Sequence, residues 1–151
     1  YNGEAVKISS GYVVGGQGSA ADTLGVLNGI FYNDASTLKP TFANFYKATI
    51  TPANSEDTTA FVIDDPFQQY VVAADAATGV TTFLETYDMN TSSGDDTTGK
   101  SDATLDIGTT SANGKQYRML RSAEDPENED AASVRHSVVV VSNLNSFNGH
   151  N

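Results

Sequence analysis

Short runs rich in Val, Ile, Thr, Tyr and Phe recur along the whole chain between clusters of Gly, Pro, Asn and Asp, and this pattern constrains the fold most strongly. Leu and Ala never recur at the spacing of three, four and seven residues that an amphipathic helix needs over three turns. The pattern therefore predicts an all-β protein, a single-domain β-barrel or sandwich of jelly-roll-like type, with about nine or ten short strands and little or no helix. We expect strands at residues 5–9, 12–14, 24–32, 41–51, 59–64, 69–73, 81–87, 103–107, 115–121 and 133–141.

Three segments support more specific predictions. The pair Ser10 and Gly11 predicts a tight turn between the first two strands. Pro40 and Pro52 confine any strand between them to a sheet edge or a short stretch, because proline cannot donate a hydrogen bond to a neighbouring strand. Four consecutive valines at residues 138–141 predict a strand that is covered on both faces, as in a central strand or a barrel wall.

Two polar segments are expected to be loops in solvent. Residues 90–101 contain no large apolar side chain, so they offer little to a core. Residues 123–130 carry five acidic side chains, which favours an extended and hydrated backbone.

Length and charge restrict the number of domains and the kinds of partner. The 151 residues correspond to one ordinary domain, so we expect a single β domain over residues 1–151. The chain begins at Tyr1 rather than Met, which leaves room for an N-terminal arm missing before residue 1.

A net charge of −11 would repel a phosphate backbone or an anionic lipid surface. The longest apolar run has four residues, far fewer than the roughly 20 of a membrane helix. We therefore expect no nucleic acid and no membrane as partners.

Two motifs resemble ligand-binding loops but depart from the pattern that the chemistry needs. Residues 16–21 fit the G-x-G-x-x-A dinucleotide fingerprint, yet residues 22–26 lead into a strand instead of the helix that would bind the pyrophosphate. Asp88 opens a run like a calcium loop, but Ser93 stands where the sharp turn needs Gly and Gly99 where the loop needs a bidentate Glu. The sequence thus predicts a glycine-rich turn and a polar loop, with no cofactor and no metal.

Candidate catalytic residues are few. Asp64 and Asp65 point to opposite sides of a strand that Pro66 ends, so we expect one of them to cap a turn. His136 is expected to be a strand residue with a polar contact, because the chain has no G-x-S-x-G nucleophile motif. Two His and no Cys cannot fill the usual zinc ligand sets without carboxylates. We expect no enzyme; a carboxylate pair that the pattern does not reveal is the remaining enzymatic alternative.

Four aromatic residues are candidates for partner binding. Phe42, Phe45 and Tyr46 lie between the two prolines, and Phe67 follows Pro66. They exceed what one strand face can bury, so one or two of them are candidate exposed anchors. Packing in the core is the alternative for each.

The order of the strand segments resembles that of small structural proteins encoded near the coat gene of tailed bacteriophages. In those proteins a run like G-D-x-V is followed by G-V-x-x-G, aromatic residues and a later D-D-P. The matching segments here are residues 3–8 (GEAVKI), 24–32 (LGVLNGIFY), 39–42 (KPTF) with Tyr46, and 60–66 (AFVIDDP). Residues 99–101, 116–120 and 138–143 fall where the family has comparable runs, while Glu4 replaces the Asp of the family pattern.

This resemblance implies a capsid decoration protein, also called a cement or head-stabilising protein. Such a protein would bind the outer face of the mature phage capsid, contact the major capsid protein, bridge coat subunits and form a homotrimer. Trimerisation would also cover exposed sheet edges. The alternative from a different class is a carbohydrate-binding or adhesive β-module of a secreted or phage tail protein, which the Thr, Asn and Asp-rich loops also fit.

Overall fold

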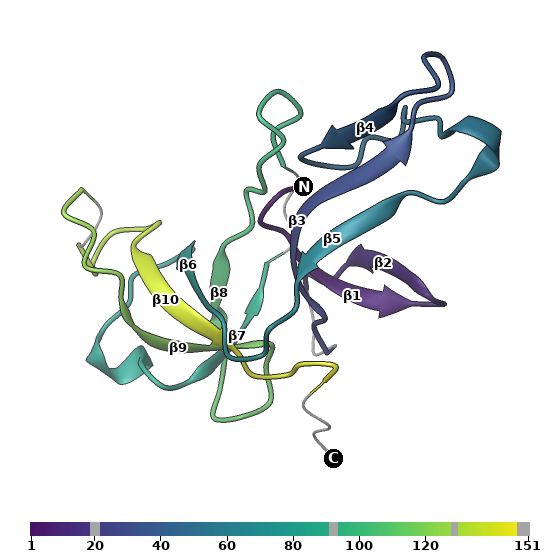
Figure 1. The fold of residues 1–151 in the computed structure, drawn as a ribbon. Coiled ribbons are helices and arrows are strands. Elements are labelled where there is room, and N and C mark those ends of the chain that lie inside the picture. The colour runs from purple at the N-terminus through teal and green to yellow at the C-terminus, as the bar shows by residue number, and fades with distance from the viewer. Residues whose placement is uncertain (19–21, 91–93, 128–129, 148–151) are drawn as a thin grey trace.

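Where the structure describes the chain, it contains ten strands arranged in two antiparallel sheets (Figure 1). The computed structural model describes residues 1–18, 22–90, 94–127 and 130–147. Sheet 1 consists of β1 (Ala5–Ser9), β2 (Tyr12–Gly15), β3 (Gly25–Asn33), β4 (Pro40–Ala43) and β5 (Thr59–Ile63). Sheet 2 consists of β6 (Gln69–Ala73), β7 (Thr86–Met89), β8 (Leu105–Ser111), β9 (Tyr117–Ser122) and β10 (Ser137–Ser142). The prediction of an all-β fold with nine or ten strands is confirmed.

Helix is confined to single turns in the part of the chain that is described. Two three-residue 3-10 turns lie between strands, Ala53–Ser55 between β4 and β5 and Val80–Thr82 between β6 and β7. Across these same ranges, no helix has the length and apolar character to cross a membrane.

Sheet 1 is built around the long strand β3. The strand order is β2-β1-β3-β4, and β5 also pairs with β3. A bulge between Leu27 and Gly29 shifts the register with β5, and Gly29 accommodates it with a φ of 132°. Leu27 and Ile30 are therefore both buried on one face of the sheet, and Phe31 points to the other face.

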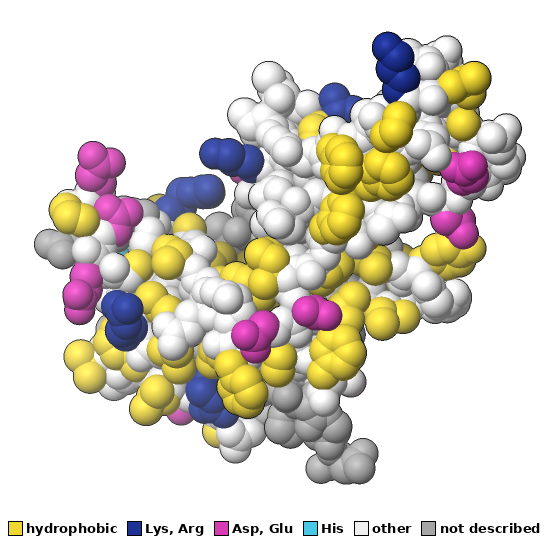
Figure 2. Space-filling model, viewed as in Figure 1, with side chains coloured by type: hydrophobic (Ala, Val, Ile, Leu, Met, Phe, Trp, Pro, Cys, Tyr) yellow, Lys and Arg dark blue, Asp and Glu magenta, His cyan; other side chains and the backbone are white. Residues whose placement is uncertain are grey.

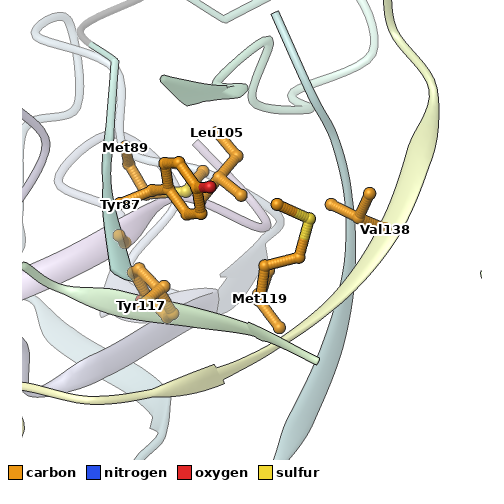
Figure 3. Packing of buried hydrophobic residues seen from close by; sticks show 8 residues of the cluster. Tyr87, Met89, Leu105, Tyr117, Met119 and Val138 are labelled. Carbon is orange, nitrogen blue, oxygen red and sulfur yellow. The ribbon is translucent and has the colours of Figure 1, made fainter. Parts of the chain in front are cut away.

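Sheet 2 curls into a partly closed barrel. Its order is β6-β10-β9-β7-β8, so β6 and β8 are the two edges. A parallel bridge between Ala74 and Leu105 joins these edges at one end, supported by a 3.0 Å hydrogen bond from the Asp75 amide to the Leu105 carbonyl. Alternate side chains fill the interior: Tyr87, Met89, Leu105, Tyr117, Met119, Val138 and Val140 (Figure 3). Burial of these side chains is the main stabilising term of this half.

The two sheets meet at the start of β1 and at the segments next to it (Figure 1). Ala5 packs in the cluster of sheet 2, and its neighbour Val6 packs in the separate cluster of sheet 1. The buried side-chain amide of Gln116, directly before β9, donates from Nε2 to the Gly16 carbonyl at 2.5 Å, and its Oε1 accepts from the Met89 amide at 3.1 Å. The junction is therefore both packed and hydrogen-bonded.

Several specific predictions are confirmed. Ser10 and Gly11 form the turn of the β1–β2 hairpin, where Ser9 pairs with Tyr12. β4 is a short edge strand, and among the described strands it pairs with β3 alone. β10 is central, between β6 and β9, and Val138, Val139 and Val140 are buried.

Two predicted strands begin four or five residues later than expected, whereas β3, β8 and β9 begin within two residues of the expected position. The prediction for residues 81–87 is wrong in its first part, because Val80–Thr82 form a 3-10 turn, Leu84 has a φ of 67°, and β7 starts at Thr86. The prediction for residues 133–141 fails in the same way, because Arg135 has a φ of 66° and β10 starts at Ser137. Positive φ in a residue with a side chain ends regular strand geometry.

The polar loop at residues 90–101 is held to the body at its base, contrary to the prediction of a purely solvated loop. The Asn2 amide donates to the Gly99 carbonyl and the Ser101 amide to the Asn2 carbonyl, both at 2.9 Å. Gly99 is buried, and a side chain there would meet the ring of Phe45. Residues 91–93 of this loop lie outside the described residues.

Candidate functional site

The four predicted anchors divide into three exposed rings and one packed ring. Phe42, Tyr46 and Phe67 are 71%, 55% and 80% exposed. Phe45 is half-buried and stacks on Tyr1, with ring centroids 5.4 Å apart and planes 13° apart. None of the four rings belongs to either buried core cluster; Phe45 packs against Tyr1 and Gly99 outside them.

Phe42 belongs to a contiguous group of rings on sheet 1, of which Phe42 and Phe61 are exposed and Phe31 is half-buried. Phe31 on β3 pairs with Phe42 on β4 at a centroid distance of 4.9 Å, and Phe61 on β5 lies 6.0 Å from Phe42. Ile63, two residues after Phe61, is 37% exposed on the same face. We call Phe31, Phe42, Phe61 and Ile63 the aromatic face, and Figure 2 shows hydrophobic side chains gathered over β3, β4 and β5.

The sequence prediction did not include Phe31 and Phe61 among the anchors. Alternation within β5 places Phe61 and Ile63 on one side, but only the pairing of β3 with both β4 and β5 brings them next to Phe42. Phe67 lies apart, in the turn after β5, where the Phe67 amide donates to Asp65 Oδ1 at 2.9 Å. This contact confirms the expected turn cap.

A groove of about 770 Å³ opens on the opposite face of sheet 1. Leu27, Ile30 and Ala60 line it, and each is a sequence neighbour of a residue that points to the other side. Tyr46, the third predicted anchor, also lines this groove rather than the aromatic face. Three acidic residues, Glu4, Glu56 and Asp57, line it as well.

Charge is distributed unequally between the two halves. Residues 1–63, which contain sheet 1, carry five acidic and three basic side chains, a net of −2. Residues 64–151, which contain sheet 2, carry fourteen acidic and five basic side chains, a net of −9. The aromatic face and the groove therefore lie on the nearly neutral half of a strongly acidic molecule.

The first residue of the candidate calcium loop, Asp88, is paired with a lysine side chain. Asp88 lies within β7, is 3% exposed, and forms an ion pair with Lys115 at 2.8 Å. Within the described ranges, no group of three or more His, Cys, Asp and Glu side chains is arranged to hold a metal ion. The ion pair explains the buried carboxylate without a metal.

The other candidate residues lie at strand ends or outside the described residues. Asp64 and Asp65 follow β5, and His136 is buried directly before β10. Residues 19–21 of the glycine-rich motif and His150 lie outside the described residues, and the chain leads from the motif into β3.

Three aspartates have lowered pKa values because their carboxylates accept hydrogen bonds within turns. The Ser36 hydroxyl and the Thr37 amide lower the pKa of Asp34. The Thr97 amide and the Thr98 hydroxyl lower the pKa of Asp95, and the Ser133 hydroxyl and Ala132 amide lower that of Asp130. Each carboxylate accepts bonds from residues two and three positions ahead, which is the geometry of a turn cap.

Comparison of the chain with family models, curated proteins and solved structures finds no match.

Proposed function

We propose that the protein is a structural protein of the virion of a tailed bacteriophage, which binds the outer face of the mature capsid and bridges neighbouring coat subunits to stabilise the head. The observation that carries this proposal is the aromatic face, because large exposed rings that contact one another are typical of binding surfaces. The strand order and motifs described above supply the resemblance to capsid decoration proteins.

The unequal charge of the two halves supports one orientation of the protein on the capsid, with the less charged half toward the coat. The nearly neutral half would face the coat protein through its aromatic face, and the half with a net charge of −9 would face solvent. This arrangement keeps most of the like charges of neighbouring copies away from the contact.

Binding through one aromatic face would be weak. Burying a Phe side chain fully contributes about 1.5–3 kcal/mol, and association itself costs at least about 4 kcal/mol. A homotrimer that contacts several coat subunits gains from effective concentration, because each further contact is intramolecular once the first has formed. The proposal therefore includes a trimer and the major capsid protein as partner.

Purified protein mixed with expanded, undecorated capsids of its phage tests the proposal. We expect the protein to bind and to raise the temperature at which the capsids are disrupted. The double variant F42S/F61S should bind at least about tenfold more weakly, since 1.4 kcal/mol corresponds to a factor of ten. The control V80S/F147S removes two exposed apolar side chains outside sheet 1 and should bind like the wild type.

Two results would contradict the proposal. One is no binding by the wild type, or binding with no gain in capsid resistance to heat. The other is binding of the isolated monomer to a glycan array, which would favour the carbohydrate-binding alternative.

A further inference from the structure

We propose that the groove on sheet 1 binds an extended peptide segment that carries apolar side chains and a Lys or Arg, and that this segment adds to the free edge of β2. In the virion the segment would belong to the coat protein, and this assignment of its source rests on the proposed function. The peptide chemistry itself follows from the groove.

The floor of the groove is apolar and belongs to a core that is only partly covered. Val6, Leu27 and Ile30 are buried at 3%, 7% and 3% exposure and line the groove. Ala60 and Val62, which pack against the same cluster, remain partly exposed. The groove volume of about 770 Å³ falls within the roughly 300–1,000 Å³ of ligand sites, so a peptide segment has room for apolar side chains.

One wall of the groove is the edge of β2. All five residues from Gly11 to Gly15 line the groove. Side chains alternate between the two faces of a strand, so consecutive residues can all line a groove only where the strand presents its edge. All four residues of β2 are exposed, and in the described part of the chain β2 pairs only with β1.

The backbone of β2 is positioned to accept another strand. Ser9 and Tyr12 flank the two-residue turn as a hydrogen-bonded pair, so the next pair, Ile8 and Val13, is not hydrogen-bonded. The amide and carbonyl of Val13 therefore point away from β1, toward the open edge. Addition of a strand to such an edge is a common mode of peptide recognition.

The charge of the rim selects a basic segment. Among the described lining residues, Glu4, Glu56 and Asp57 are acidic and none is Lys or Arg. Glu4 is already paired with the N-terminal ammonium group at 2.6 Å, so Glu56 and Asp57 provide the available negative charge. A second copy of this acidic chain is a poor occupant for the same reason, whereas Lys or Arg beside apolar residues is complementary.

Selection from a display library of short random peptides against the full protein tests this inference without the coat protein. We expect the enriched peptides to alternate apolar residues and to contain Lys or Arg. Binding of an enriched peptide should slow hydrogen exchange at the Val13 amide. The variant V13P removes that amide and should abolish binding, while its position opposite Ile8 leaves the β1–β2 hydrogen bonds in place.

Two double variants that each remove two negative charges distinguish an effect of the groove rim from an effect of the net charge of the protein. E56Q/D57N should weaken binding of the peptide about five- to tenfold, because two charge contacts are lost. E124Q/E127Q removes the same charge from exposed residues of the loop after β9 and should leave binding unchanged. The inference is wrong if no such peptide is enriched, or if the enriched peptides bind V13P and E56Q/D57N as tightly as the wild type.

The same variants distinguish this inference from the proposed function. Capsid binding that V13P leaves at the wild-type level would overturn the groove as the coat contact while the proposed function stands. Peptide binding without any capsid binding would overturn the proposed function while the peptide site stands.

Discussion

The ion pair between Asp88 and Lys115 joins two side chains that differ strongly in burial. The side chain of Asp88 is 5% exposed and that of Lys115 is 27% exposed. Without Lys115, the carboxylate stays buried without a counter-charge, whereas without the carboxylate the ammonium group can turn toward water.

We therefore expect K115M to lower the free energy of unfolding by about 2–3 kcal/mol and D88N by only about 1 kcal/mol. Urea denaturation at neutral pH measures both values. An equal decrease in the free energy of unfolding of the two variants would show that burial of the unpaired carboxylate does not determine the destabilisation.

Tyr117 gives the protein a sensitivity to alkaline pH. Burial raises the pKa of its phenol well above the ordinary 10.0, against a smaller opposing effect of a hydrogen bond with Thr23. Above pH 10 the unfolded chain therefore loses this proton while the folded protein keeps it, so stability falls as the pH rises.

We expect the free energy of unfolding to decrease between pH 10 and pH 12, and Y117F to show a smaller decrease over that interval. Urea denaturation at successive pH values measures the slope. The exposed Y12F is the matched control and should keep the wild-type slope; a Y117F slope equal to that of the wild type would contradict the assignment.

At the scale of elements, the β1–β2 hairpin depends on its turn. Ser10 and Gly11 have φ values of 51° and 86°, the pair of positive values that a type I′ turn requires. Gly adopts this conformation without strain, and Asn tolerates it better than Ser.

We expect G11A to destabilise the protein by roughly 1–2 kcal/mol and S10N to stabilise it by a few tenths of a kcal/mol. No atom lies within 4 Å of a Cβ built at Gly11, so the effect of G11A isolates backbone strain. Thermal denaturation of the two variants should shift the midpoint in opposite directions.

The sequence predicts most strands of this fold because each one is a local run of β-branched and aromatic residues. It does not predict where the strands begin when one residue has positive φ, as Leu84 and Arg135 do, since tertiary contacts impose that conformation. It also missed the packing of Gly99 against Phe45, because a glycine contributes to packing by what it leaves room for.

The candidate site was predictable in part. The excess of aromatic residues around short strands predicts one or two exposed rings among the four candidates, and the structure has three, Phe42, Tyr46 and Phe67. The division of Phe42 and Tyr46 between two faces of sheet 1 was not predictable, because it depends on the register of β3 with its neighbours.

For the whole molecule, the net charge of −11 opposes assembly of the proposed trimer. Salt screens this repulsion, since the Debye length falls from about 30 Å at 0.01 M to about 8 Å at 0.15 M ionic strength. We expect the fraction of trimer at one protein concentration to rise over this range of salt. Light scattering after size exclusion measures it, and a monomer at every salt and protein concentration would contradict a trimer.

The position of β1 also determines how the molecule carries mechanical load. Ala5 and Val6 are consecutive residues anchored in two separate clusters, so tension on sheet 1 passes to sheet 2 through covalent backbone. The hydrogen bond between Gln116 and Gly16 is a second connection between the two halves and shares the load. A protein joined in this way can be pulled at one half and resist at the other without relying on a flexible linker.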